Sequence, residues 1–342
     1  MSARVDPPSE FFRAIEAFDA RAANDLVIEF MDEGAPMGTI IEDVLAPAQV
    51  RVGQLWESGR WSVADEHVAT SVTEGALSAL TYAARPSRAA STLHMAVACA
   101  EGEWHSLPAR MAATVAGATG RTRVTMLGAS VPADQLHRRL SAGDIDVLAL
   151  SCTMPTNLVG AARCIAAAHE LQVPVIVGGR ALGTSPHRAH AIGADDWAEG
   201  AERLLGPVPE LAGRSSEVST EVLLLDDVTD AVIASAYDRV VRAFPQLSSM
   251  PVHQQGRTRE DLRWMARFTA GALLTNDVTI VEELLAWLCA TLRDSMPASL
   301  ITTSAQLLAE LLEQQTTSGA ALLRHAAETV AAGASAVENH RD

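Results

Sequence analysis

The feature that most constrains the fold is a change of hydrophobic period between residues 92 and 210. Short apolar runs of strand length alternate there with helix-length stretches such as Leu107–Ala118. The runs are Leu93–Cys99, Val124–Leu127, Val147–Leu150 and Val173–Val177. Strands that alternate with helices indicate a parallel, doubly wound sheet of the Rossmann-like or flavodoxin-like type. Because ligands of such sheets bind beyond the carboxyl ends of the strands, we expect the functional residues in those loops.

The segments on both sides of this region have a helical period instead. Residues 9–84 contain four helix-like runs, which predict a four-helix bundle. Residues 221–342 carry no strand signal and predict an all-helical domain. The polar stretches 85–91 and 211–220 are expected linkers, so the fold class is multidomain, α and α/β, with domains 9–84, 92–210 and 221–342. The helices expected in the last domain are Glu221–Phe244, Thr258–Leu274, Asp277–Arg293, Ala298–Gln314 and Gly319–Ala332.

The charge balance and the cysteines exclude several classes of function. The formal net charge of −16 and the absence of any Lys/Arg run longer than two argue against direct contact with nucleic acid. The 4 cysteines form no Cys-x-x-Cys pair, which argues against a zinc site or a disulfide framework. The apolar runs are too short to cross a bilayer, and Met1–Pro8 has no signal-peptide pattern. We therefore expect a cytoplasmic protein without a membrane partner.

The strongest chemical pattern directly follows the first predicted strand. Glu103, Trp104 and His105 stand in the loop after Leu93–Cys99. A histidine in that position can offer one ring nitrogen to a metal, while a carboxylate two residues earlier accepts the proton on the other nitrogen and fixes the tautomer. Taken alone, the pair is equally typical of solvated loop residues on a generic flavodoxin-like domain.

Further motifs in the same order resemble the cobalamin-binding domains of the methionine-synthase and methylmalonyl-mutase type. Those domains carry Asp-x-His-x-x-Gly, then Ser-x-Leu/Thr, then Gly-Gly. The matches here are Glu103-Trp104-His105, Ser151-Cys152-Thr153 and Gly178-Gly179, with Glu103 in place of the aspartate and Pro108 in place of the first glycine.

The resemblance implies a base-off cobalamin with His105 as the lower ligand of cobalt. Its nucleotide tail would enter the domain. Ser151 and Thr153 would hydrogen-bond the displaced benzimidazole, and Gly178 and Gly179 would let the backbone approach the tail.

A second pattern lies in the predicted bundle. Trp56 is followed after nine residues by Glu66 and His67, at the start of a helix that Ser62 and Asp65 are expected to cap. The spacing resembles the cap of CarH-type cobalamin photoreceptors. It implies that Trp56, in the loop after the preceding helix, packs over a 5′-deoxyadenosyl group, that Glu66 hydrogen-bonds it, and that His67 is a candidate replacement ligand.

This second match is incomplete. The CarH-type repressors carry a DNA-binding helix-turn-helix ahead of the bundle, where this chain has about eight residues, and a histidine at the position of Glu57. The alternative is a core tryptophan and a glutamate placed by the helix dipole.

The last predicted domain contains a basic stretch that is unusual in an acidic protein. Arg259, Arg263 and Arg267 recur at four-residue spacing and therefore share one helical face. Such a face can bind two propionates. An exposed face paired with the many carboxylates of the domain remains the alternative. Other candidates for contacts to a planar tetrapyrrole are His253, Arg257, Asp261 and Trp264.

The order of bundle, cobalamin domain and helical domain resembles photocobilins, photoreceptors that carry both B12 and a bilin. The resemblance implies a globin-like third domain that binds a biliverdin-like bilin. Binding would be non-covalent, because Cys289 lies inside an apolar run.

We therefore predict a light-sensing signalling protein that binds adenosylcobalamin, acts on an unidentified partner protein and has no enzyme activity, with a homo-oligomer left open. The alternatives are the cobalamin-carrying subunit of a corrinoid methyltransferase and a light-independent B12 sensor.

Overall fold

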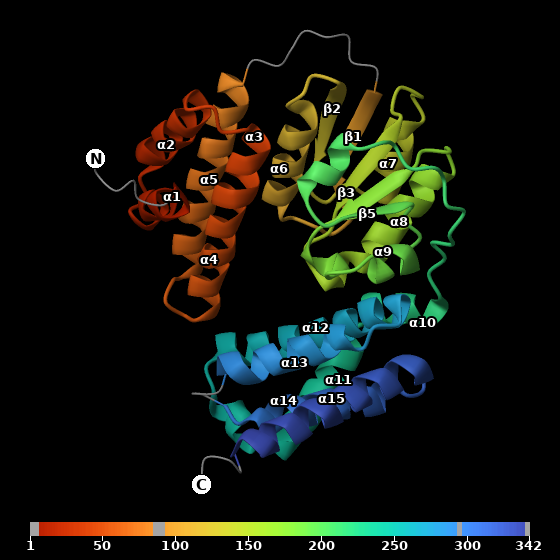
Figure 1. The fold of residues 1–342 in the computed structure, drawn as a ribbon. Helices are drawn as coiled ribbons and strands as arrows, with labels where there is room; N and C mark the ends of the chain where they lie inside the picture. The colour runs from red at the N-terminus through yellow and green to blue at the C-terminus, as the bar shows by residue number, and fades with distance from the viewer. Residues whose placement is uncertain (1–6, 85–92, 293–295, 339–342) are drawn as a thin grey trace. The chain divides into compact units, whose positions relative to one another are not determined.

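The computed structural model describes residues 7–84, 93–292 and 296–338, which form two compact units (Figure 1). The predicted linker 85–91 lies outside the described residues. The first unit contains residues up to 151 together with 167–179 and 195–212. The second unit contains residues 152–166, 180–194 and those from 213 onward.

The first unit begins with the predicted bundle of four helices. Its helices are α1 (Pro7–Glu16), α2 (Ala20–Asp32), a third helix built from α3 (Met37–Thr39), the π-helix η1 (Ile40–Leu45) and α4 (Ala46–Glu57), and α5 (Val63–Ala83). The capping box of α5 is confirmed, because Ser62 and Asp65 exchange side-chain and backbone hydrogen bonds. The π-turn precedes Pro47, which has no amide hydrogen for the carbonyl one turn earlier.

The sheet of the first unit is parallel and has the order β2-β1-β3-β4-β5. Its strands are β1 (Leu93–Cys99), β2 (Thr122–Gly128), β3 (Val147–Ser151), β4 (Val175–Gly178) and β5 (Asp196–Ala198). The register pairs Cys99 with Ser151, Ser151 with Gly178, and Gly178 with Ala198. The carboxyl ends of four strands therefore meet in one row. The doubly wound sheet is confirmed, although β5 was not predicted and β4 begins two residues later than expected.

Helix α6 (Ser106–Gly117) joins the bundle to the sheet, between which it lies in Figure 1. Leu107, Met111 and Val115 recur at four-residue spacing and are buried in the core of the bundle. Ala109 and Ala116, on the other side of the helix, are buried against the sheet core. One helix thus serves two cores because a bulky stripe and an alanine stripe occupy different faces.

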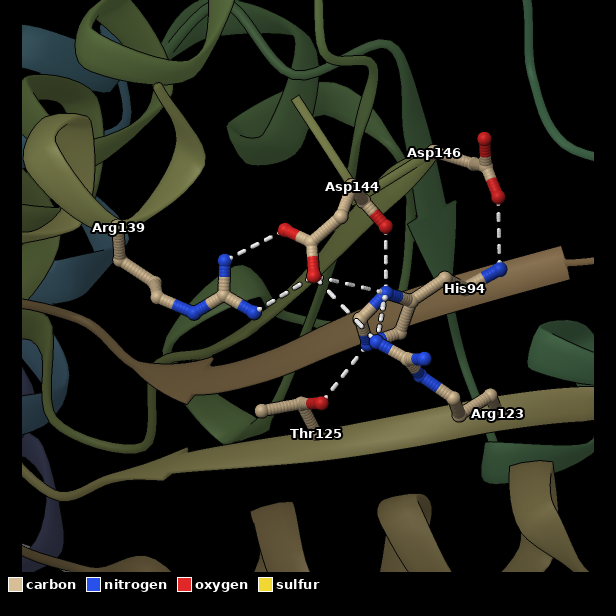
Figure 2. Close-up of polar contacts among 6 residues, drawn as sticks. All are labelled: His94, Arg123, Thr125, Arg139, Asp144 and Asp146. Atoms are coloured by element: carbon tan, nitrogen blue, oxygen red, sulfur yellow. Dashed lines mark hydrogen bonds and ion pairs between the residues drawn. The ribbon is translucent and has the colours of Figure 1, made fainter. Parts of the chain in front are cut away.

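A polar cluster closes the amino-terminal end of the strands, opposite the row described above (Figure 2). The backbone amide of His94 donates to Asp146 (2.7 Å), and its ring contacts the hydroxyl of Thr125 (2.8 Å) and the carbonyl of Asp144. Arg139 donates to the carboxylate of Asp144 (2.7 Å) and is the main cause that lowers the pKa of that group. The remaining member is Arg123. These residues bond one another, so the cluster ties β1 to the turn before β3.

The remaining helices follow the strands and fill the carboxyl-terminal part of the chain. In the α/β region they are α7 (Ala133–Leu140), η2 (Pro155–Asn157), α8 (Leu158–His169), η3 (Arg180–Leu182), α9 (His187–Ala191) and η4 (Ala201–Leu205). After it come α10 (Thr220–Asp226), α11 (Asp230–Ala243), η5 (Pro245–Ser249), α12 (Val252–Thr275), α13 (Thr279–Leu292), α14 (Ala298–Leu312) and α15 (Thr317–Glu338). No helix in the described part of the chain is long and apolar enough to span a membrane.

The predicted helix Glu221–Phe244 is wrong in one respect. The structure divides it into α10, which ends at Asp226, and α11, whose start is capped by the Thr229 side chain, which accepts from the amide of Val232. The described residues of the last domain contain helices and no strand, as expected. The prediction that these helices are globin-like stays a prediction.

The second unit also contains two segments of the predicted 92–210 domain, a division that the sequence did not predict. Residues 152–166 and 180–194 belong to the same compact unit as the carboxyl-terminal helices. The physical reason is a set of polar contacts across the sequence. Arg267 of α12 donates to the carbonyl of Thr156 (3.0 Å), and Arg188 of α9 donates to Asp277 (2.8 Å).

Candidate functional site

The predicted pair Glu103 and His105 forms directly beyond the end of β1. Glu103 Oε1 accepts a hydrogen bond from the backbone amide of His105 (2.9 Å) and lies 2.6 Å from His105 Nδ1. The Glu103 side chain is fully buried, whereas 58% of the His105 side chain is exposed. Nε2 of His105 makes no hydrogen bond within the described part of the chain. The carboxylate therefore fixes the Nδ1–H tautomer and leaves Nε2 to bind a metal.

The loop that carries this pair is held by its own backbone and by the loop after β2. The carbonyl of Glu103 accepts from the amide of Ser130 (2.7 Å), and the amide of Gly102 donates to the Ser130 hydroxyl (3.1 Å). Gly102 has a φ of 87°, a left-handed conformation that favours glycine. The side chain of His105 is thus positioned by the fold before any ligand binds.

The surrounding charges act on His105 in a consistent direction. The hydrogen bond that His105 donates to Glu103 is the main cause that raises the pKa of His105; burial opposes this rise, and the charges of Glu103 and Glu66 add to it. Burial, with a smaller contribution from Glu103, raises the pKa of the Cys99 thiol to about 12. Cys99 therefore stays protonated and is not a competing ligand.

The row of strand ends opens onto a cavity of about 400 Å³ between α6, η4 and the sheet. Ser151, Gly178 and Gly179 line it, and Ser151 is 9% exposed. A Cβ atom on Gly178 would lie 3.2 Å from the carbonyl oxygen of Ala198, and Gly179 has a φ of 109°. Both positions therefore favour glycine, and the cavity has the size of a site for a small heterocycle. Thr153 lies two residues after Ser151, in the second unit.

The bundle places its predicted residues at the facing ends of α4 and α5. Glu66 lies in the first turn of α5, where its Oε1 accepts from the Thr70 hydroxyl (2.8 Å). His67 is exposed, and its Nε2 lies 3.5 Å from Glu66 Oε2. Trp56 was expected in a loop, and this is wrong: it lies in the last turn of α4 and is 38% exposed, because the helix continues to Glu57.

Two further polar residues of the bundle, Gln49 and Glu42, make contacts that were not predicted. Gln49 of α4 bonds both Thr70 (3.1 Å) and Thr73 (2.6 Å), so it supports the hydroxyl that contacts Glu66. Thr70 stands four residues after Glu66, a spacing that would have indicated the contact. Glu42 in the π-turn accepts from the amide of Glu202 (3.3 Å) and lines the cavity, and no local sequence pattern indicates either role.

The arginines on the predicted face of α12 have partners within the protein, and two of these partners are carboxylates, as the alternative interpretation expected. The Arg259 guanidinium lies over the ring of Tyr237 (3.6 Å to its centre), and Arg263 forms an ion pair with Asp230. Arg267 contacts Asp226 (3.5 Å) as well as Thr156. These partners lie on α10 and α11 and after β3, so the face is already occupied by groups of the protein.

Asp261 on the same helix is a half-buried acid. Burial raises its pKa to about 6, with a smaller contribution from Glu260, and Arg257 opposes the shift. Trp264, one turn further on, is 36% exposed. His253 and Arg257 are exposed at the start of the helix. The structure therefore places Arg257, Asp261 and Trp264 within two turns of α12.

Comparison with known families identifies both parts of the first two-thirds of the chain. Residues 9–81 match a family model described as a B12 binding domain, and residues 93–205 match another model with the same description. These matches indicate a cobalamin cofactor and confirm the predicted cobalamin-binding region.

The chain is also similar to a curated protein and to solved structures. The HTH-type transcriptional repressor CarH of Myxococcus xanthus is 34% identical over 138 residues, which are 40% of this chain and 44% of that protein. The chain thus spans less than half of the relative's length. These findings support a CarH-like cobalamin-binding protein.

Two solved structures overlap the chain. The Methanosarcina barkeri monomethylamine corrinoid protein covers 57% of this chain and 92% of its own, with 21% identity and a TM-score of 0.49. The match to a cobalamin-binding protein of Desulfitobacterium hafniense DCB-2 covers 59% of this chain and 100% of that protein, with 21% identity and a TM-score of 0.32.

Proposed function

We propose that this protein is a light sensor that binds adenosylcobalamin between the helical bundle and the α/β region. The observation that carries the proposal is the geometry of His105, whose exposed imidazole is held by Glu103 through Nδ1 and has Nε2 available to a metal, while Glu66 of the bundle adds a smaller contribution to its raised pKa. A bundle carboxylate and a metal-binding imidazole thus lie near one another, as a cofactor with a ligand on each face requires.

The residues present fit cobalamin in chemical type. His105 would bind cobalt through Nε2, and Glu103 would hold the ring through Nδ1. Ser151, Gly178 and Gly179 would hold the nucleotide tail in the cavity that they line. Thr153 would add a hydroxyl from the loop after β3.

Bound adenosylcobalamin supplies a cobalt–carbon bond that visible light cleaves. Trp56 and Glu66 would contact the adenosyl group in the dark, and Gln49 and Thr70 would keep the Glu66 carboxylate in place. If the adenosyl group left in the light, Trp56 and Glu66 would lose contacts that they make with it only in the dark state. Such a difference in contacts between two states is what a conformational switch needs.

The test is an absorption spectrum of the full-length protein with adenosylcobalamin, before and after green light. We expect a light-driven loss of the alkylcobalamin bands. In the dark, the spectrum should be that of a cobalamin in which His105 replaces the benzimidazole as the lower ligand, and the variant His105→Ala should lose this feature of the dark spectrum. Glu66→Gln should weaken binding of adenosylcobalamin relative to methylcobalamin, and Glu29→Gln on the exposed side of α2 is the matched control.

Each alternative gives a different result in this experiment. Alkylcobalamin bands that persist under light would contradict the light sensor and leave a light-independent B12 sensor. Tighter binding of methylcobalamin than of adenosylcobalamin, unaffected by Glu66→Gln, would instead support a corrinoid-carrying subunit of a methyltransferase. The expectations of a protein partner, of no direct DNA contact and of no intrinsic catalysis stay predictions.

A bilin in the carboxyl-terminal helices is a second proposal, favoured by the half-buried carboxyl of Asp261. Burial raises the pKa of Asp261 to about 6, so its ionised form is costly in this environment. A ligand that donates N–H groups to the carboxylate would lower this cost. Trp264 would stack on the tetrapyrrole, and His253 and Arg257 lie on the same helix. Arg259 and Arg263 would reach propionates by exchanging their present partners, which costs little for the exposed pair of Arg263 with Asp230.

Reconstitution with biliverdin tests the second proposal. We expect a red absorption band that co-purifies with the protein and is released on denaturation, because the binding is non-covalent. Asp261→Asn should lower the retained bilin, whereas Asp238→Asn on the exposed side of α11 should not. Equal retention by both variants, or no retention by the unaltered protein, would contradict this site.

A further inference from the structure

We propose that the carboxyl-terminal helices position the two loops that follow the residues of the proposed nucleotide-tail site, so that tail binding and the packing of these loops on the helices are coupled. The proposal rests on the proposed binding of cobalamin. The loops are 152–158, which directly follows Ser151, and 180–187, which directly follows Gly179. Both belong to the second compact unit, together with α10 to α15.

The first loop is held against α12 by a glycine contact. A Cβ atom on Gly271 would lie 2.8 Å from the carbonyl oxygen of Pro155 and 3.2 Å from a methyl carbon of Leu158. The first of these distances is shorter than real Cβ contacts, and a backbone atom has little freedom to give way. Gly271 therefore lets α12 approach the backbone of this loop to a distance that no other residue permits.

Arg267, one turn before Gly271, fixes the same loop through a hydrogen bond. Its guanidinium donates to the carbonyl of Thr156 (3.0 Å) and contacts Asp226 of α10 (3.5 Å). Arg163 of α8 contacts the same carboxylate (3.6 Å). Since the Asp226 side chain is 13% exposed, the two guanidiniums compensate a largely buried charge, and removal of either one would leave that charge poorly paired. The loop is thus tied to α10 and α12 together.

The second loop is held by Arg188 of α9. Its guanidinium donates to the carbonyl of Ala181 (3.2 Å), two residues after Gly179, and also to Asp277 (2.8 Å) and to the hydroxyl of Thr279 (3.1 Å). The side chain of Arg188 is 10% exposed. One buried guanidinium therefore bridges the loop after β4 to the junction between α12 and α13.

The contacts that hold the two loops have a functional consequence because few residues separate them from the proposed tail-binding residues. Thr153 lies two residues before Pro155, and Gly179 two residues before Ala181. A displacement of α12 would move the backbone that follows both tail-binding motifs. By linkage, a ligand that fixes these motifs must also stabilise the packing of the loops on α12 to the same extent.

Comparison of cobalamin with cobinamide, which has the same corrin but no nucleotide tail, tests the proposal. Gly271→Ala should weaken cobalamin binding by at least about fivefold and change cobinamide binding by less than about twofold. Gly256→Ala is the matched control, because Gly256 lies on the same helix and a Cβ atom there meets nothing within 4 Å. Arg188→Gln should repeat the selective loss, with Arg324→Gln as its control at the ion pair with Glu313 (2.6 Å).

Amide hydrogen exchange supplies a readout that does not depend on the cofactor. In the ligand-free protein, exchange over 152–158 should be faster in Gly271→Ala than in Gly256→Ala. In the unaltered protein, cobalamin should slow exchange in α12 more than cobinamide does. If Gly271→Ala does not fold, Arg267→Lys serves the same comparison, because it keeps the charge beside Asp226 and loses the fork geometry.

The outcomes separate the two proposals. Equal cobalamin affinity in Gly271→Ala and Gly256→Ala would overturn the positioning role, and so would equal losses of cobalamin and cobinamide. An unaltered protein that binds neither corrinoid would overturn the proposed function. Selective loss of cobalamin in Gly271→Ala and Arg188→Gln, with unchanged controls, would establish the coupling.

Discussion

Asp261→Asn makes a sharp test of the electrostatics of α12. The pKa of Asp261 rises from 3.8 to about 6 because burial disfavours its charged form. The folded protein therefore holds this proton more tightly than the unfolded chain does. Its contribution to the free energy of unfolding is fully present below about pH 4 and is lost as the pH rises toward about 6. The loss is at most about 3 kcal/mol, at about 1.4 kcal/mol for each unit of pKa.

The measurement is urea denaturation of the unaltered protein and of Asp261→Asn between pH 4 and pH 8, with exchange of α12 amides to locate the effect. The variant stays neutral, so its advantage in free energy should grow with pH and level off above about pH 7. Asp238→Asn controls for the removal of one exposed charge. An advantage that does not change with pH would refute the reasoning. If biliverdin donates N–H groups to this carboxylate, the bilin-bound protein should show a smaller pH dependence.

Three substitutions and one labelling experiment test the remaining parts of the first unit. Glu103→Gln should weaken cobalamin binding by about 10- to 100-fold in a spectrophotometric titration, because the amide no longer holds the Nδ1–H tautomer as strongly; equal affinity would contradict this role. Gly179→Ala should destabilise the fold by about 1–2 kcal/mol in urea, since its φ is 109°. Ser62→Ala should cost about 1 kcal/mol through loss of the capping box, measured in the same way. Cys99 should resist a thiol reagent at pH 8 until the protein unfolds, because its pKa is about 12.

The sequence predicted those parts of the site that depend on local spacing. Two residues separate Glu103 from His105, and a strand end followed by a tight loop brings such a pair into contact. The start of α5 is equally local, since Ser62 and Asp65 bond within one turn. The alternation of strands and helices fixed the parallel sheet, and the row of strand ends followed from it. Physical chemistry at short range was sufficient in each case.

The parts that the sequence did not predict depend on contacts between distant segments or on burial. The bond from Arg267 to Thr156 joins positions 111 residues apart, and the arginine spacing that includes Arg267 does not indicate this partner. The spacing of the arginines predicted one helical face correctly, but only the packed structure shows that other helices already supply partners for it. Likewise, the raised pKa of Asp261 comes from its surroundings and has no signature in composition.

Helix α6 has one further consequence for how such a protein can change over time. His105 directly precedes this helix, whose Leu107, Met111 and Val115 are embedded in the bundle core. The proposed metal ligand therefore directly precedes the helix that packs in the bundle core. The alanines on the other side of this helix pack against the sheet. Substitutions of Leu107 or Val115 can change the packing of the bundle without altering the residues proposed to contact the cofactor, whereas Met111 also lines the proposed tail cavity. Under the proposed function, natural variation at Leu107 and Val115 would adjust the strength of the light response while the residues proposed to bind the cofactor stay the same.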